Sequence, residues 1–147
     1  MTQLEQAFQK ENYFPINFTL NGVGHPCIEF TLNNQPVIFL LDTGAASNLL
    51  DSGFATRLGI PLIPTGQKGG GAGGLVSDIY SIGNLQLQYR ELAFNISPFF
   101  AMDWTTILAT LKAKGVAEKF DGILGFGFFK QFQCFIDYAS NRLYVKS

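Results

Sequence analysis

Residues 38 to 44 read Ile-Phe-Leu-Leu-Asp-Thr-Gly, and the expected architecture of the chain follows from this stretch. Four consecutive apolar residues, preceded by Val37, are typical of a buried strand. The strand leads directly into Asp42 and then into Gly44, where a missing Cβ permits a tight turn. A carboxylate at the end of a buried strand is costly unless it is paired or used. Asp42 is therefore the candidate functional side chain, with a turn-forming aspartate as the simpler alternative.

The composition indicates one folded domain that has few charges. The chain has 147 residues, of which 47% are hydrophobic and 14% charged, whereas disordered chains show the opposite balance. The net charge of −1, with scattered basic residues, gives no electrostatic footprint for nucleic acid or an anionic membrane surface. No apolar run approaches the ~20 residues of a membrane span. We therefore expect neither nucleic acid nor membrane as a partner, and the apolar surplus suggests burial against another protein.

The sequence offers no metal or cofactor chemistry. Cys27 and Cys134 stand apart without CxxC spacing, which favours buried structural thiols over a disulfide. His25 serves no serine or cysteine motif, so a surface or structural histidine is expected. No cluster of His, Cys, Asp and Glu has metal-ligand spacing. The first ten residues are polar and lack the apolar core of a secretory signal, which slightly favours the cytoplasm.

Hydrophobic periodicity predicts a mostly β chain with short helices. Alternating apolar residues predict strands over Phe14–Leu20, Cys27–Leu32, Leu75–Ile82 and Leu85–Ile96. The turn Asn33–Pro36 is expected to join the second of these to the Asp42 strand as a hairpin, and Gly83-Asn84 to separate the last two. Helices are expected over residues 3–10, over Leu49–Leu58 with Asp51 or Ser52 near the start, and over 103–119 with Asp103 as the cap.

A glycine cluster occupies residues 66–74, where six of nine residues are glycine. Gly69, Gly71 and Gly74 match the spacing of a dinucleotide-binding fingerprint. That motif requires a preceding strand and a following helix, but here a proline-bearing coil precedes it and a strand pattern follows. A nucleotide site is therefore not expected, and a solvated linker-like loop is the main alternative to a functional role.

Three landmarks, in order, resemble the retropepsin-like aspartic protease family in its bacterial and cellular form. Leu41-Asp-Thr-Gly-Ala45 resembles the catalytic loop of that family, and the glycine-rich region follows where the family has its flap. Ile123-Leu-Gly125 is similar to the segment that crosses behind the catalytic loop. The resemblance covers roughly residues 14–146, nearly the whole chain.

The resemblance implies a closed, barrel-like acid-protease fold with one or two short helices and one lobe per chain. It covers a protease domain over residues 14–147, preceded by an extension over 1–13 that is expected to be helical. Because the chain holds one such loop, the implied enzyme is a homodimer in which one Asp42 from each subunit shares a proton and activates water. The implied substrate is an extended polypeptide with apolar side chains near the cut, and no cofactor is implied.

The remaining site residues follow from the same resemblance. The active-site loop includes Thr43, Gly44 and Ala45; the flap lies within residues 67–77 and includes Gly69, Gly70, Gly71, Ala72, Gly73 and Gly74; the loop support is Ile123, Leu124 and Gly125. Ala45 has no hydroxyl to donate to the carboxylate, unlike the Ser or Thr of pepsin-type loops, which predicts a mildly acidic activity optimum. The segment near 98–119 is expected to be a helical insertion, and Trp104 in it lines either a substrate pocket or the core.

Two other functions stay open on the sequence. A catalytically silent dimer or a peptide-binding module with this fold would keep the loop without using it for hydrolysis, because a fold does not fix a function. A self-processing protease would cut near its own N-terminus. The helix expected at residues 3–10 leaves open how a dimer would be held together.

Overall fold

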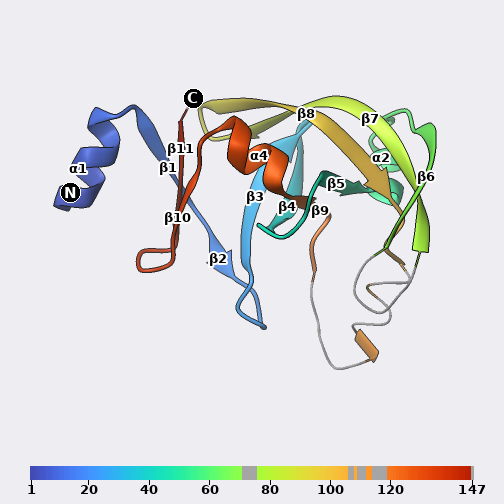
Figure 1. Ribbon diagram of the computed structural model, residues 1–147, viewed down its shortest axis with the longest axis horizontal. Coiled ribbons are helices and arrows are strands. Elements are labelled where there is room, and N and C mark those ends of the chain that lie inside the picture. Colours follow the sequence, from blue (N-terminus) through green and yellow to red (C-terminus); the bar gives the residue numbers. More distant parts are fainter. Residues whose placement is uncertain (71–75, 106–107, 109–111, 114–118, 147) are drawn as a thin grey trace.

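A closed ring of strands forms the body of the protein (Figure 1). The computed structural model describes residues 1–70, 76–105, 108, 112–113 and 119–146. Within these residues the ring runs through β3 (Pro26–Leu32), β4 (Gln35–Leu41), β9 (Gly122–Leu124), β5 (Asn48–Asp51), β8 (Leu92–Met102) and β7 (Val76–Tyr89). The ring closes where β7 pairs back with β3, through Thr31 and Gln88. The expected closed, mostly β fold is confirmed.

The other elements extend or flank this ring. At one end of the molecule β6 (Ile63–Gly70) pairs with β7. The short strand β2 (Thr19–Leu20) pairs with β3, at the opposite edge of the same sheet. A separate three-stranded sheet at the other end has the order β1 (Tyr13–Asn17), β11 (Arg142–Lys146), β10 (Phe135–Asp137). The described helices are α1 (Gln3–Lys10), α2 (Ser52–Arg57) and α4 (Phe126–Gln131). Both chain ends thus lie at the end of the molecule opposite the β6–β7 hairpin (Figure 1).

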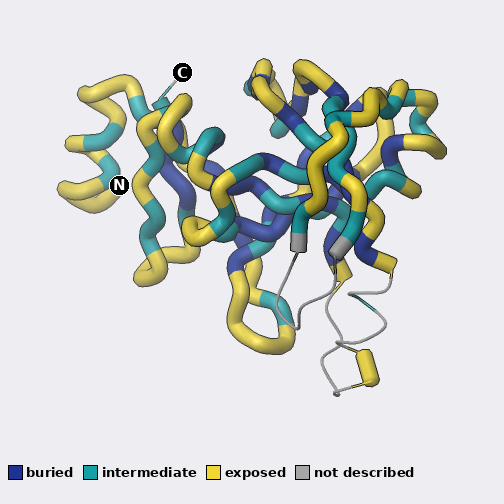
Figure 2. Tube along the Cα trace, turned by 45° about the vertical axis from the view of Figure 1, so that its right-hand side comes forward, coloured by how far each residue is buried: buried dark blue, intermediate teal, exposed yellow. Residues whose placement is uncertain are grey.

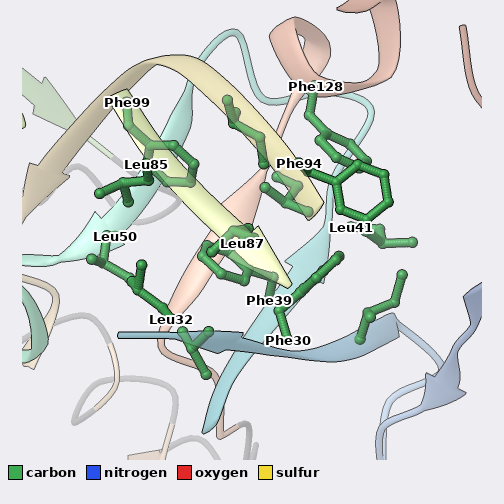
Figure 3. Packing of buried hydrophobic residues seen from close by; sticks show 14 of the residues in the cluster. Phe30, Leu32, Phe39, Leu41, Leu50, Leu85, Leu87, Phe94, Phe99 and Phe128 are labelled. Carbon is green, nitrogen blue, oxygen red and sulfur yellow. The ribbon is translucent and has the colours of Figure 1, made fainter. Parts of the chain in front are cut away.

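The main hydrophobic core lies inside the ring (Figure 3). Its largest fully buried members labelled in this view are Phe30, Leu32, Phe39, Leu50, Leu87, Phe94, Phe99 and Phe128. Burying one such side chain stabilises the fold by about 1.5–3 kcal/mol. Figure 2 shows the same distribution, with buried segments in the strands at the centre and exposed segments at the turns and in α1.

A second, smaller cluster lies on the opposite face of the same strands. Its buried members are Leu40, Met102, Trp104 and Phe120. Because side chains alternate along a strand, β4 sends Phe39 and Leu41 into the main core and Leu40 into this second cluster. The two faces of β4 therefore belong to two different apolar layers.

The hairpin that delivers β4 forms as expected. Residues Asn33 and Asn34 both have positive φ, at 51° and 64°, which is the conformation of the tight two-residue turns that match the twist of a hairpin. Asparagine tolerates this backbone region better than most residues. The turn fixes the register between β3 and β4, pairing Phe30 with Val37 and Ile28 with Phe39.

The helix expected over Leu49–Leu58 was wrong in its first part. Residues Asn48–Asp51 form β5, which pairs in parallel with β8 and antiparallel with β9. These long-range pairings override the local helical pattern. The helix begins at Ser52, and Asp51 caps it by accepting a hydrogen bond from the Phe54 N–H (3.3 Å), as expected.

The break expected at Gly83-Asn84 was also wrong. Strand β7 runs unbroken through both residues, and its pairing with β8 shifts register on either side of Gly83. Gly83 has φ of 73°, so the glycine accommodates a β-bulge and not a turn. The chain reverses instead after Tyr89, where Arg90 takes a positive φ of 54°. The strand expected over Phe14–Leu20 is likewise divided between β1 and β2, in separate sheets.

The segment after β8 is described only in part. Residues 98–102, expected to begin a helical insertion, belong to β8. Asp103 then accepts a hydrogen bond from the Thr105 N–H (2.9 Å), and the hydrogen bonds from Thr105 lower the pKa of Asp103. The Leu108 N–H donates to the Trp104 carbonyl (2.8 Å), which is a helical hydrogen bond. The remainder of the helix expected over 103–119 falls largely outside the described residues.

The helix expected at residues 3–10 is present as α1 and lies beside the three-stranded sheet. Thr2 and Glu5 form a capping box at its start. Glu5 also makes an ion pair with Arg142 on β11 (2.7 Å), and the Phe8 ring stacks on Tyr144 with centroids 4.0 Å apart. No helix in the described part of the chain is long and apolar enough to cross a membrane.

Candidate active site

Asp42 lies directly after β4, in a tight loop that is held by its own backbone. The Gly44 N–H donates to Asp42 Oδ1 (2.9 Å), and the Ala45 N–H donates to the Asp42 carbonyl (3.1 Å). A Cβ added at Gly44 would lie 3.3 Å from Asp42 Oδ1, which is closer than nine in ten real contacts of that kind. The glycine therefore lets the backbone N–H approach the carboxylate, and the carboxylate gains a fixed donor.

A second segment braces this loop from behind. The Asp42 N–H donates to the Leu124 carbonyl (3.0 Å), and the Phe126 N–H donates to the Ala45 carbonyl (2.8 Å). Strands β4 and β9 run parallel, with Leu41 opposite Leu124. The segment Ile123–Gly125, predicted from the sequence as loop support, thus lies against the Asp42 loop. Leu124 bonds to one end of the loop, and the next residue, Phe126, bonds to the other.

Gly125 is required by the closeness of this contact. A Cβ added at Gly125 would lie 2.6 Å from the carbonyl oxygens of both Ala45 and Ser47. These are backbone atoms, so they yield only if the loop itself moves. Glycine at this position allows the brace and the Asp42 loop to touch backbone to backbone.

Asn48 completes the brace, which is the segment Ile123–Phe126 behind the Asp42 loop. The sequence alone did not identify Asn48 as a site residue. It is the one polar side chain among the described residues that is fully buried, at 1% exposure. Its Oδ1 accepts from the Gly125 N–H (3.0 Å), and its Nδ2 donates to the Pro98 carbonyl (3.4 Å). The available signal was an amide placed just before the apolar pair Leu49-Leu50, since a buried amide needs specific partners.

The front of the loop faces solvent. Asp42 is half-buried, while Thr43 and Gly44 are exposed and Ala45 is partly buried. Among the described residues, no hydrogen bond or ion pair joins Asp42 to a second acidic side chain. A single chain therefore presents one carboxylate, supported from behind and open in front.

The described part of the glycine-rich region lies in β6, which forms a long hairpin with β7. Strands β6 and β7 pair antiparallel, with Gly69 opposite Ser77 and Gly70 opposite Val76. An exposed ion pair between Lys68 and Asp78 (3.8 Å) spans this arm. The predicted flap residues Gly71, Ala72, Gly73 and Gly74 lie outside the described residues, while Gly69 and Gly70 end β6.

The described part of the chain places no metal-binding group here. It contains no group of three or more His, Cys, Asp or Glu side chains arranged to hold a metal ion. Neither Cys27 nor Cys134 forms a disulfide, and burial raises the pKa of Cys134 to about 12. The ionisable group that the loop geometry singles out is the Asp42 carboxylate.

Comparisons with solved structures find a similar architecture in two proteases and in a protease-like domain. The chain is similar to a retropepsin-like aspartic protease from Rickettsia conorii (TM-score 0.60, 21% identity, covering 90% of this chain and 98% of that one). It is similar to the retroviral protease-like domain of Ddi1 from Leishmania major (TM-score 0.59, 19% identity, 81% and 86% covered). It also resembles the EIAV protease in complex with an inhibitor (TM-score 0.52, 21% identity, 77% and 92% covered). These similarities show a shared fold.

The family comparison rests on sequence. A model of the aspartyl protease family matches residues 28–128, which include the Asp42 loop, the glycine-rich hairpin and the Ile123–Gly125 brace. No curated protein matched the chain in the corresponding search. The match spans more than half of the chain, and the fold agrees with it. The chain therefore belongs to the aspartyl protease family and has the retropepsin-like fold.

Proposed function

We propose that this protein is an aspartic endopeptidase that acts as a homodimer, with one Asp42 from each subunit. The observation that carries the proposal is the braced loop: the Asp42 carboxylate accepts from the Gly44 N–H, while hydrogen bonds to the Leu124 carbonyl and from the Phe126 N–H hold the two ends of the loop. A carboxylate held this rigidly and left half-open is suited to positioning a reacting water. We assign residues 14–147 to the protease domain and residues 1–13 to an N-terminal extension.

The dimer follows from the chemistry. Peptide hydrolysis by carboxylates needs two groups, one to accept a proton from water and one to donate a proton to the scissile carbonyl. Each chain supplies one Asp42 in a loop whose front residues, Thr43 and Gly44, are exposed. A twofold axis in front of this loop would bring two copies of Asp42 together. The exposed face thus fits contact with a second copy of the same loop.

In the proposed reaction, the two Asp42 carboxyl groups of the dimer share one proton. Two carboxylates within ~3 Å cannot both ionise, so the pair holds one proton. The ionised Asp42 removes a proton from water, and that water attacks the peptide carbonyl. The protonated Asp42 of the other subunit donates to the carbonyl oxygen, which gives a tetrahedral diol. Collapse of the diol with protonation of the amine releases both products, and no covalent intermediate with the protein forms.

The β6–β7 hairpin is assigned as the flap, over residues 67–77. Its described part ends at Gly69 and Gly70, two residues that impose little restriction on backbone torsion. A hairpin arm that closes over the site would exclude water and pair its backbone with an extended peptide. The substrate is therefore an extended polypeptide, and the apolar surroundings of the site favour apolar side chains near the cut.

The test is cleavage of a mixed peptide library between about pH 3 and pH 8 by the wild type and by Asp42→Asn. The substitution keeps the shape of the side chain and removes its ability to act as a base. We expect wild-type cleavage with a mildly acidic optimum and a loss of at least about a thousandfold in the variant, with unchanged melting temperature. Equal cleavage by both proteins would contradict the assignment of Asp42.

One observation favours a second candidate, a catalytically silent dimer or peptide-binding module. The described chain holds Asp42 without another carboxylate in contact, so the loop is incomplete for hydrolysis until a partner supplies one. This candidate predicts that the protein binds extended peptides, or dimerises, and cuts none of them. Absence of cleavage at concentrations where sedimentation shows a dimer would favour it over the peptidase.

A further inference from the structure

A cavity of about 680 Å³ lies against the outer face of the three-stranded sheet. Residues directly opposite each other in a sheet share a face, so Asn17 of β1 lies beside Arg142 of β11 on this outer face. Ile16 and Leu143 alternate with them and lie in the main core. Helix α1 packs on part of the outer face, and the cavity lies between α1, β1, β11 and the turn that joins β7 to β8. The residues that line it belong neither to the Asp42 loop nor to its brace.

A continuous set of contacts joins this sheet face to the β7–β8 turn. Arg142 lies opposite Asn17 in the sheet. The Asn17 N–H donates to the Tyr89 hydroxyl (3.2 Å), and the guanidinium carbon of Arg90 lies over the Tyr89 ring, 5.4 Å from its centroid. Arg90 and Arg142 both line the cavity. Two arginines that are far apart in the sequence are therefore brought to one cavity by neighbouring elements of the fold.

The charged side chains that line the cavity are Arg90, Arg142 and Glu5. Glu5 makes its ion pair with Arg142 (2.7 Å), and the Tyr144 hydroxyl and Glu5 together raise the pKa of Arg142, so this guanidinium stays charged. Arg90 makes no ion pair with any residue that the structure describes. The lining side chains thus carry one positive charge more than they balance. A guanidinium binds a carboxylate through two parallel hydrogen bonds, so this excess charge suits a singly charged carboxylate.

Arg90 is an unusual residue for its place in the turn. Its φ of 54° lies in the left-handed region, which asparagine and glycine adopt more easily than other residues. The other non-glycine residues with positive φ in the described chain are mostly asparagines: Asn12, Asn33, Asn34 and Asn141, with Gln133. An arginine held in this conformation, with its guanidinium at the cavity, indicates a role for the side chain that the turn itself does not require.

We propose that this cavity is a binding site for a small organic carboxylate that carries a single negative charge. Arg90 binds the carboxylate group, and the amide side chains of Gln9 and Asn17, which also line the cavity, bind polar groups in the rest of the ligand. A volume of about 680 Å³ lies within the range of about 300–1,000 Å³ that is usual for small-molecule sites. The inference goes beyond the proposed peptidase function and does not depend on it.

The test measures the binding of hippurate and of its neutral amide, hippuramide, by titration calorimetry at neutral pH and low salt. The two molecules have nearly the same shape and differ in charge. Hippurate is expected to bind at least about tenfold more tightly, because only the carboxylate makes charge-assisted hydrogen bonds to Arg90. Arg90→Gln is expected to weaken hippurate binding by at least about tenfold and to leave hippuramide binding unchanged. Glutamine is compatible with this backbone conformation, since Gln133 adopts a φ of 47° in the same chain.

The matched control is Arg57→Gln. Arg57 is an exposed arginine that lies over the Phe54 ring at 5.5 Å, as Arg90 lies over Tyr89, but it does not line the cavity. It is expected to leave hippurate binding unchanged. Equal affinity of the wild type for hippurate and hippuramide overturns the proposal, as does binding that survives Arg90→Gln or is weakened equally by Arg57→Gln. Absence of hippurate binding up to about 10 mM overturns it as well.

Discussion

The two faces of β4 differ in the side chains that they contact and in the role that we expect for them. Phe39 and Leu41 point into the interior of the closed ring of strands, where they pack against aromatic and aliphatic side chains. They are 0% and 5% exposed. Leu40 points the other way, into the smaller cluster, and stands two residues before Asp42. One strand therefore contributes one set of residues to the main core and the other set to the smaller cluster. We expect the second set to matter more for the site, because Leu40 stands so close to Asp42 in the chain. A change on the first face should act on stability, and a change on the second on cleavage.

The largest effect is expected from the core face. Phe39→Ala leaves a cavity among Phe30 and Phe99, whose rings contact Phe39 at centroid distances of 5.9 and 5.8 Å. The free energy of unfolding should fall by about 3–5 kcal/mol, measured by denaturant titration. Leu40→Ala is the matched variant on the other face and should cost less. A greater loss for Leu40→Ala than for Phe39→Ala would contradict the division between the faces.

The next effect tests the brace behind the loop. Gly125→Ala places a methyl group 2.6 Å from two carbonyl oxygens of the Asp42 loop, so the loop has to move. A displacement of this kind is expected to lower kcat by about a hundredfold. Gly22→Ala is the control, because an added Cβ there meets nothing within 4 Å. Full activity in Gly125→Ala would show that the brace does not position Asp42.

A smaller effect is expected from the buried amide. Asn48→Ala leaves the Gly125 N–H unpaired in the interior and should lower the free energy of unfolding by about 1–3 kcal/mol. Cleavage should fall along with it, because the same hydrogen bond holds the brace. Asn95→Ala, on the exposed surface of β8, serves as the control and should change neither quantity. Thermal melting and the initial rate of peptide cleavage provide the two readouts.

The smallest effect concerns pH. Ala45→Ser adds a hydroxyl that can donate to the ionised carboxylate pair of the proposed dimer. A donor to the charged form favours that form, so the acidic limb of the rate profile should move to lower pH, by less than about one unit. Ala46→Ser adds the same group at an exposed neighbouring position and should leave the profile unchanged. A shift toward higher pH would contradict the argument from Ala45.

The sequence predicted the Asp42 strand, its hairpin and its loop because local signals determine them. Alternating apolar residues, the asparagine turn and Gly44 act within a few positions of one another. The pairing of Asn48–Asp51 with β8 and β9 depends on residues some 50 and 75 positions away. The local helical pattern therefore predicted the wrong secondary structure for this segment. The bulge at Gly83 shares its sequence signal with a turn, so neighbouring residues alone do not distinguish the two.

The site was predictable only in part for a related reason. Asp42 and the Ile123–Gly125 segment belong to short motifs, which can be recognised from consecutive residues alone. The hydrogen bond from Gly125 to Asn48 joins two segments 77 residues apart and leaves no periodic signature. Trp104 was open to two interpretations, core or pocket, because which cluster it joins depends on the face of the sheet that it covers.

The central claim is that each active unit contains two copies of Asp42, and subunit mixing tests it most directly. A fixed amount of wild type is equilibrated with increasing Asp42→Asn, and peptide cleavage is measured. If heterodimers are inactive, random pairing lowers the activity to about half with equal amounts of the variant and to about one sixth with a fivefold excess. Activity that stays constant as the variant is added would show that one chain works alone and would contradict the account.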